Sequence, residues 1–257
     1  MKPKLAVWKF SSCDGCQLTL LDCEDELLAL AERVEIAYFL EATRTQLDGP
    51  YDVSLVEGSI STPDEVERIK DVRADSKMLV SIGACATAGG FQALRNTRDH
   101  AELQKTVYAH PEYLDALDTS TPISDHVKVD FELRGCPIDK AQLVEVLLAV
   151  LKGRAPVIAN YSQCVECKMS GTPCIVVTRG TPCIGPATKG GCGNLCPTVG
   201  RGCYGCFGPK DKPNTAVLAD QLITSGTEKR VVKDLFAGYT GGAPAFADEI
   251  QRLGGEQ

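Results

Sequence analysis

Thirteen cysteines decide which chemistry this 257-residue chain can perform. Eight of them fall in one stretch that is rich in Gly and Pro and poor in apolar residues. Such a stretch cannot bury enough apolar surface to offset its chain entropy, so disulfides, structural zinc or iron–sulfur clusters must order it. These eight are Cys164, Cys167, Cys174, Cys183, Cys192, Cys196, Cys203 and Cys206.

The number of cysteines favours iron–sulfur clusters over the other two ways of ordering the stretch. An odd number fits poorly with complete disulfide pairing. The N-terminal segment MKPKLAVWKF has no signal-peptide core, which predicts a reducing, cytoplasmic location. A four-iron cluster needs four thiolates, and thirteen cysteines divide into three quartets and one remaining residue. Zinc held by four thiolates is the alternative.

Charge and composition exclude two other classes of protein. The net charge of −7 argues against nucleic acid as the main partner. The sequence has no run of about 18 apolar residues, so no membrane-spanning helix is expected. A hydrophobic content of 44% and a charged content of 24% are those of an ordinary globular protein.

The elements that position the cysteines alternate between strands and helices over residues 1–155. This alternation predicts an α/β fold with a parallel, doubly wound sheet. A Gly-Arg-Ala-Pro segment at residues 153–156 marks the expected boundary with a second domain, residues 156–257, which is irregular and cysteine-rich. We expect strands at residues 4–10, 34–40, 51–56, 77–82 and 126–133, and helices at residues 17–33, from Thr62 onward, 137–152, 215–224, 228–237 and 245–253.

Four further cysteines each follow a predicted strand. Cys13 and Cys16 follow the first strand, Cys85 follows the fourth, and Cys136 follows the last. In a doubly wound sheet, ligands bind beyond the carboxyl ends of the strands. The fold therefore predicts one four-thiolate site that is built from three loops.

The eight cysteines of the second domain can be divided in two ways. Consecutive quartets give each site a C-x-x-C pair, which sets two ligands from one tight loop. An interleaved arrangement is the alternative, as in bacterial ferredoxins where a cysteine before Pro binds the other cluster, and here Pro197 follows Cys196. We prefer the consecutive quartets. Three clusters in a row would form a path for electrons, which separate zinc sites would not.

The remaining candidates have plainer interpretations. Cys23 lies in the first predicted helix and is expected to be a small buried apolar residue. His100, His110 and His126 are isolated and are expected to be surface or packing residues. Glu57 ends the third strand and is either a solvated loop acid or a neighbour of the first site. Arg134 either offsets cluster charge or is an ordinary surface residue.

A flavin is a weaker alternative for the first domain. In a flavodoxin-like domain, the loop after the first strand holds the phosphate of FMN through hydroxyl side chains and a helix N-terminus. Here that loop carries a Cys-Asp-Gly-Cys sequence, and a pair of thiolates would compete with a phosphate.

The order of these motifs resembles the small subunit of nickel–iron hydrogenases. The likeness is greatest to the cytoplasmic group that couples hydrogen to NAD(P), which includes the sulfhydrogenase delta subunits, and it covers about residues 4–210. A likeness to the cluster-bearing subunit of respiratory complex I is limited to the first domain, because that family has an adjacent cysteine pair and no eight-cysteine tail. The motifs are SSCDGCQLTLL, VEGSI, IGACATAGG, RGCP, PCIGPATKGGCGNLCP and GCYGC.

The resemblance implies a flavodoxin-like first domain and three 4Fe–4S clusters. The proximal cluster would be held by Cys13, Cys16, Cys85 and Cys136. The distal cluster would be held by Cys164, Cys167, Cys174 and Cys183, where many membrane-bound relatives have a histidine at the first position. The medial cluster would be held by Cys192, Cys196, Cys203 and Cys206, a complete quartet where those relatives often lack one cysteine.

The resemblance also implies a function and partners. The chain would relay electrons from hydrogen oxidation in a nickel–iron large subunit to a diaphorase module with flavin, NAD(P) and ferredoxin-like subunits. It would have no catalytic centre of its own. The equivalent subunit of a hydrogenase that serves coenzyme F420 or heterodisulfide reductase is one alternative. A zinc-stabilised interaction protein is an alternative of another class.

Overall fold

The chain folds into two compact units, residues 1–157 and 158–257, in a computed structural model that describes residues 2–158 and 160–255. Each unit has its own hydrophobic core. Within the described residues, no helix is both long and apolar enough to cross a lipid bilayer.

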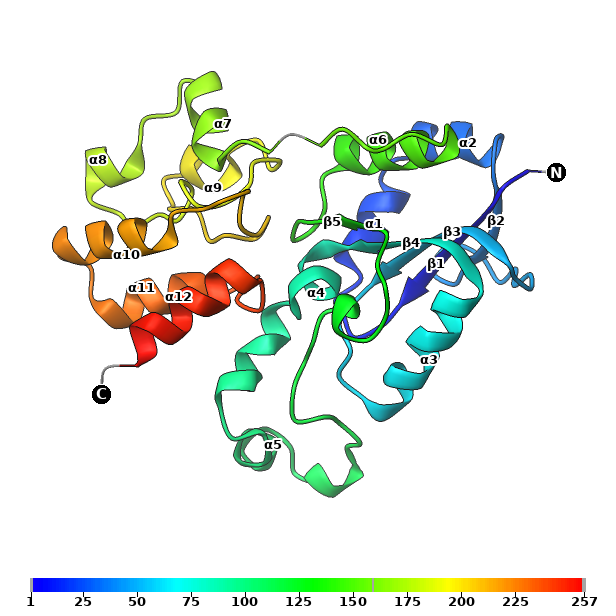
Figure 1. The fold of residues 1–257 in the computed structure, drawn as a ribbon, viewed down its shortest axis with the longest axis horizontal. Helices are drawn as coiled ribbons and strands as arrows, with labels where there is room; N and C mark the ends of the chain where they lie inside the picture. Colours follow the sequence, from blue (N-terminus) through cyan, green and yellow to red (C-terminus); the bar gives the residue numbers. More distant parts are fainter. Residues whose placement is uncertain (1, 159, 256–257) are drawn as a thin grey trace. The chain divides into compact units, whose positions relative to one another are not determined.

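A five-stranded parallel sheet forms the centre of the first unit (Figure 1). Its strand order, β2-β1-β3-β4-β5, is that of flavodoxin-like folds, which confirms the predicted fold class. The middle strands β3 and β4 are buried along most of their length because helices cover both faces of the sheet. The strands are β1 (Lys4–Lys9), β2 (Glu35–Phe39), β3 (Tyr51–Glu57), β4 (Ser76–Ile82) and β5 (Phe131–Leu133).

Three helices of this unit, α3, α5 and α6, begin at residues whose side chains accept a hydrogen bond from the first helical turn. Helix α3 starts at a capping box in which the Thr62 hydroxyl accepts from the Glu65 N–H and the Glu65 carboxylate accepts from the Thr62 N–H. Helix α6 starts after Asp139, three residues later than expected. The helices are α1 (Gly15–Leu21), α2 (Asp25–Ala31), α3 (Pro63–Ala74), α4 (Gly83–Ala88), α5 (His100–Val107) and α6 (Lys140–Leu151).

The single helix expected over residues 17–33 is wrong, because two helices occupy this range. Helix α1 ends at Leu21 and α2 begins at Asp25, with Glu24 at a φ of 41° between them. Carboxylates destabilise the C-terminus of a helix and stabilise an N-terminus. The acids Asp22, Glu24 and Asp25 therefore favour the end of one helix and the start of another. Cys23 consequently lies in the connection and not within a helix.

The expected strand over residues 126–133 is shorter than predicted. Only β5 pairs with β4, through the register Val80 to Phe131 and Ile82 to Leu133. The segment before it is a long connection with 3₁₀ turns at Phe91–Thr97, Pro111–Tyr113 and Ile123–Asp125.

The second unit joins short helices in the cysteine-rich segment to a three-helix core (Figure 1). Phe236 and Phe246 meet edge to face with ring centroids 5.2 Å apart in that core. Ile184 and Ala187 of the cysteine-rich segment pack against the same core, so the segment has an apolar attachment as well as its cysteines. The helices are α7 (Gln163–Met169), α8 (Ile175–Arg179), α9 (Leu195–Thr198), α10 (Thr215–Thr224), α11 (Lys229–Ala237) and α12 (Pro244–Gly254).

Candidate metal centres

Three loops bring four cysteines together at the carboxyl edge of the sheet. Cys13 precedes α1 and Cys16 lies in its first turn, directly after β1. Cys85 lies in α4, directly after β4, and Cys136 follows β5. The structure thus places each of these residues where strand order and chain direction predict it. All thirteen cysteines of the chain are free thiols.

The four thiols are close enough to affect each other's protonation. Burial, then the charges of Glu57, Cys85 and Cys136, raise the pKa of Cys16. Burial raises the pKa of the Cys136 thiol to about 11, and the Cys85 and Cys13 sulfurs add to this effect. Burial also raises the pKa of Cys85, with Cys13 among the smaller causes. Anionic sulfur in this pocket therefore needs a positive centre to offset its charge.

Glycines leave room for the sulfur atoms. A Cβ atom on Gly83, whose φ is +87°, would lie 2.5 Å from the Cys16 sulfur. A Cβ atom on Gly90, whose φ is +71°, would lie 2.6 Å from the Cys85 sulfur. Both positions require glycine for their backbone conformation and for the close approach of chain to thiol.

Glu57 is buried beneath this site, so the alternative of a solvated loop acid is wrong. The side chain is 2% exposed. One carboxylate oxygen accepts from the Cys16 backbone N–H at 3.0 Å, and the other accepts from the Gln17 side-chain amide at 2.9 Å. Burial raises the pKa of Glu57. The hydrogen bonds from Gln17 and Cys16 lower this pKa, but by less than burial raises it. Glu57 thus fixes the first turn of α1, which carries Cys16.

Gln92 contacts the same site, and sequence analysis did not identify it. Its Nε2 donates to the Ser11 carbonyl and to the Ser59 hydroxyl, each at 2.8 Å. Both amide hydrogens are therefore used, and Oε1 lies 3.7 Å from the Cys85 sulfur. No sequence pattern points to this contact, because a turn at Gly89 and Gly90 separates Gln92 from the helix of Cys85.

In the second unit, Cys164, Cys167, Cys174 and Cys183 form one group. Burial raises the pKa of the Cys164 thiol to about 11, and Cys183, Cys167 and Cys174 all contribute. Burial also raises the pKa of Cys183, again with Cys167 and Cys174 among the causes. Cys164 and Cys167 lie on α7, and Cys174 caps the N-terminus of α8. The division of the eight cysteines into consecutive quartets stays a prediction, because Cys183 also contacts Cys203.

The other four cysteines come together as two pairs. Cys192 and Cys196 interact electrostatically, and Cys203 interacts with Cys206 and, more strongly, with Cys183 of the other group. The Cys203 backbone N–H also donates to the Cys183 sulfur at 3.1 Å, and the Gly205 N–H donates to the Cys203 sulfur at 3.4 Å. The union of the two pairs into one quartet stays a prediction.

Two polar residues of α7 lie beside these sulfurs and were also missed from the sequence. Gln163 is 1% exposed, and its amide nitrogen lies 3.4 Å from the Cys167 sulfur, one helical turn away. A carboxylate oxygen of Glu166 lies 3.9 Å from the Cys192 sulfur and accepts from the Asn194 N–H. Gln163 and Cys167 are four residues apart on α7, and this i, i+4 spacing would have predicted that their side chains lie side by side.

The remaining candidates lie outside these groups. Cys23 is 2% exposed, and its thiol donates to the Thr19 carbonyl, which agrees with a packing role. Arg134 pairs with Glu132 at 2.9 Å. The histidines His100, His110 and His126 contact Asp118, Glu112 and Thr121 respectively. Within residues 2–158 and 160–255, no group of three or more His, Cys, Asp or Glu side chains surrounds a point where a single metal ion could bind.

Taken together, the residues of the first site fit an iron–sulfur cluster. They supply four clustered thiols, glycine backbone that approaches two of them closely, and no disulfide among them. The first group of the second unit offers four clustered thiols as well. Backbone N–H groups directed at sulfur, as at Cys183 and Cys203, are typical of such clusters.

A comparison with protein families gives the chain a context. The sequence profile of the family described as "NADH ubiquinone oxidoreductase, 20 Kd subunit" matches residues 13–150. These residues include all four cysteines of the first site.

Individual relatives extend this likeness over most of the chain. Sulfhydrogenase 2 subunit delta of Pyrococcus furiosus is 40% identical over 90% of this chain and 97% of its own length. A subunit of the F420-non-reducing hydrogenase vhu of Methanocaldococcus jannaschii is 31% identical over 81% of this chain and 83% of its own length.

A solved structure with a related fold is a chain of an NAD⁺-reducing [NiFe]-hydrogenase in its H₂-reduced state. It superimposes with a TM-score of 0.57 and 30% identity, covering 62% of this chain and 96% of that chain. Both the fold and the sequence comparisons therefore lead to hydrogenase subunits.

Proposed function

This chain belongs to the NADH ubiquinone oxidoreductase 20 Kd subunit family, among its hydrogenase members, and from this premise we propose that it is the electron-transfer small subunit of a nickel–iron hydrogenase. The observation that carries the proposal is the convergence of Cys13, Cys16, Cys85 and Cys136 at the carboxyl edge of a flavodoxin-like sheet. Hydrogen is cleaved in a partner large subunit, and this chain has no catalytic centre of its own.

Three 4Fe–4S clusters are proposed, one in a domain of residues 1–155 and two in a domain of residues 156–257. Such clusters accept and pass on single electrons. The mutual electrostatic contacts within each of the first two groups support their assignment as separate ligand sets. The proximal ligands are Cys13, Cys16, Cys85 and Cys136; the distal ligands are Cys164, Cys167, Cys174 and Cys183; the medial ligands are Cys192, Cys196, Cys203 and Cys206.

The side chains around the cysteines hold them in place. Glu57 fixes the turn of Cys16, and Gln163 lies against Cys167. Burial of Cys16, Cys183 and Cys203 limits the access of water to their sulfur atoms, and the backbone N–H of Cys203 donates to the Cys183 sulfur. These contacts set both the geometry of the ligands and the local charge that a bound cluster would experience.

The electron acceptor is proposed to be a diaphorase module with flavin and NAD(P), reached through ferredoxin-like subunits, in the cytoplasm. The NAD⁺-reducing structure supports this acceptor. The relative from the F420-non-reducing hydrogenase supports the alternative of a hydrogenase that serves another acceptor. Free thiols at all thirteen cysteines agree with a reducing compartment.

The proposal is tested on the complex that copurifies with the full chain. Three four-iron clusters predict about twelve irons per chain and broad visible absorbance, together with hydrogen-dependent reduction of a viologen dye. A zinc-stabilised interaction protein would instead contain zinc, lack colour and reduce no dye with hydrogen.

The contact of Gln92 with Cys85 leads to a prediction about the proximal cluster. The partial negative charge of the amide oxygen faces a ligand sulfur and disfavours an added electron. Replacing Gln92 by leucine is therefore expected to raise the reduction potential of this cluster, measured by redox titration with EPR detection. Gln104→Leu, on α5, is the matched control and should leave the potential unchanged. A lower potential in the Gln92 variant would contradict the assigned orientation of the amide.

A further inference from the structure

A stretch of the second unit carries positive charge only. Between Glu166 and Asp211 the sequence has five Lys or Arg residues and no Asp or Glu. The whole chain, in contrast, has a net charge of −7. This local reversal of charge is the kind of asymmetry that attracts an anionic partner. The five cations are Lys168, Arg179, Lys189, Arg201 and Lys210.

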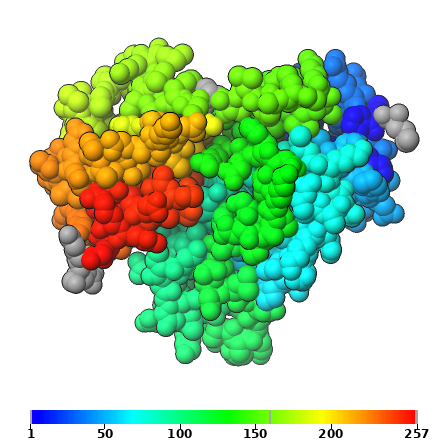
Figure 2. All heavy atoms as spheres, in the orientation of Figure 1, coloured from blue at the N-terminus to red at the C-terminus, as the bar shows by residue number. Residues whose placement is uncertain are grey.

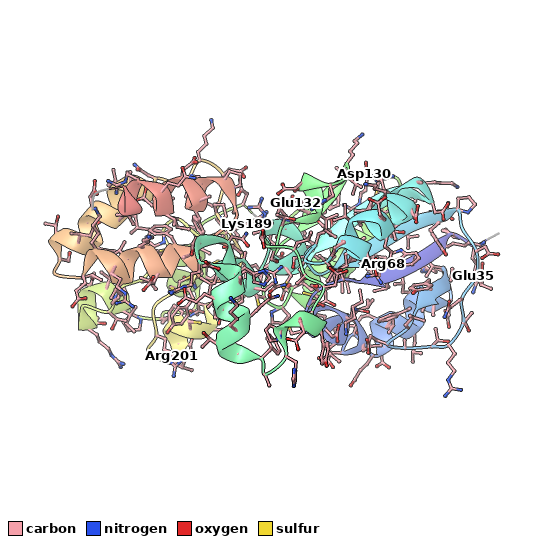
Figure 3. All side chains as sticks on the ribbon, turned by 90° about the horizontal axis from the view of Figure 1, so that it is seen from below. Glu35, Arg68, Asp130, Glu132, Lys189 and Arg201 are labelled. Carbon is pink, nitrogen blue, oxygen red and sulfur yellow. The ribbon has the colours of Figure 1, made fainter. Side chains whose placement is uncertain are left out.

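Three of these cations have no partner among residues 160–255, the part of the unit that the structure describes. Lys168, Arg179 and Arg201 are exposed, and none forms an ion pair or side-chain hydrogen bond among the described residues. Figure 3 labels Arg201, whose side chain points outward beside α9. A Cβ atom on Gly200 would lie 2.6 Å from Nη1 of Arg179, so the end of α8 meets the loop that carries Arg201.

Exposed apolar side chains accompany the cations. Met169 is 78% exposed, Val177 is 84%, Leu195 is 67% and Val199 is 68%. Single exposed apolar residues are ordinary on a protein surface. Four strongly exposed apolar side chains within 31 residues are more than that, and such clusters mark sites of protein–protein interaction. They lie at the C-terminal end of α7, in α8 and at both ends of α9, and the outer surface of α7 and α8 is visible in Figure 2.

A hollow of about 470 Å³ separates these three helices. Ser170, Thr178, Thr198 and Arg179 line it, and Met169, Val177 and Val199 are their sequence neighbours. Pro173 and Ile175 line it too, on either side of Cys174. Cys174 is an exposed cysteine of the first group in this unit. The hollow therefore opens beside a proposed cluster ligand.

We infer that this surface, made by Lys168, Met169, Val177, Arg179, Val199 and Arg201 around the hollow, docks an acidic electron-carrier protein. The inference rests on the proposed function and names the partner surface of the same electron path. Carboxylates of the carrier pair with the three cations, and its apolar residues cover the valines and the methionine. Charge at the rim with apolar contacts inside it is the usual anatomy of a transient interface.

The test compares two acceptors of hydrogen-derived electrons in the purified complex. One is an acidic two-cluster ferredoxin, and the other is benzyl viologen, a small dye that needs no docking surface. The double variant Arg179→Glu/Arg201→Glu is expected to lower kcat/KM for ferredoxin by about ten-fold or more, chiefly through slower association. Viologen reduction should not slow, because added carboxylates attract this dication. In the unaltered complex, the ferredoxin rate should fall as salt is raised.

Matched controls exist in the same unit. Arg230→Glu changes an exposed cation on α11, outside the surface, and should leave both rates unchanged. Val177→Asp should slow ferredoxin reduction, whereas Val217→Asp, at a 59% exposed position on α10, should not.

Several outcomes would overturn the inference. One is an unaltered or salt-independent ferredoxin rate, and another is an equal loss in the Arg230 control. Parallel loss of both acceptors would mean that the cations act on the clusters instead of on a partner. If the unaltered complex did not reduce viologen with hydrogen at all, the proposed function itself would be refuted. If it reduced viologen but the charge-reversed variant reduced ferredoxin normally, only the docking surface would be refuted.

Discussion

Replacing Cys16 by alanine is expected to stop the transfer of electrons out of the hydrogen-cleaving partner. Cys16 is a buried cysteine of the first group, and its sulfur interacts with those of Cys85 and Cys136. A four-iron cluster that loses one of four thiolate ligands is expected to be lost or inactive. The iron content should fall from about twelve to about eight per chain, with the loss confined to the first unit. Hydrogen-dependent viologen reduction should fall by at least about a hundred-fold, roughly 2.7 kcal/mol of activation free energy.

Cys23→Ala is the matched control for this variant. Cys23 is also buried in the first unit, but its thiol donates to the Thr19 carbonyl and contacts none of the four cysteines. This change should cost about 1 kcal/mol of stability and leave iron content and dye reduction near their original values. Full hydrogen-dependent dye reduction in the Cys16 variant would show that the proximal ligand set is assigned incorrectly.

A single methyl group at Gly202 is expected to remove both clusters of the second unit. A Cβ atom there would overlap the Pro182 carbonyl oxygen and lie 3.2 Å from the Cys183 Cα. Gly202 precedes Cys203, and Pro182 precedes Cys183, so one side chain would separate two cysteines from different ligand sets. The hydrogen bond from the Cys203 N–H to the Cys183 sulfur would break. In Gly202→Ala, iron should fall from about twelve to about four per chain, as measured by metal analysis.

Gly193→Ala separates this steric effect from backbone strain in the same segment. Gly193 has a φ of +64°, but a Cβ atom there would meet nothing within 4 Å. The strain of a left-handed alanine is about 1–2 kcal/mol, which should lower stability while the iron remains bound. If Gly202→Ala also kept its full iron content, the close packing of the two loops would not be needed for cluster binding.

Local sequence determined much of the first unit. Alternating apolar strands and helices predicted the doubly wound sheet, and the capping box at Thr62 and Glu65 placed the start of α3. Positions directly after strands also predicted the convergence of Cys13, Cys16, Cys85 and Cys136, because parallel strands end at one edge. Where charge opposed the apolar pattern, at Asp22 to Asp25, the single predicted helix was wrong and two helices formed.

Only the tertiary structure decided which polar groups surround the cysteines. Glu57 and Gln92 are 41 and 7 residues from the cysteines that they contact, and their roles depend on burial and on hydrogen bonds to other loops. Such contacts leave no periodic trace in the sequence, whereas strand order follows from patterns of two and of 3.6 residues. The same holds for the close approach of Gly202 to Pro182, since two irregular loops meet there through packing and not through any local rule.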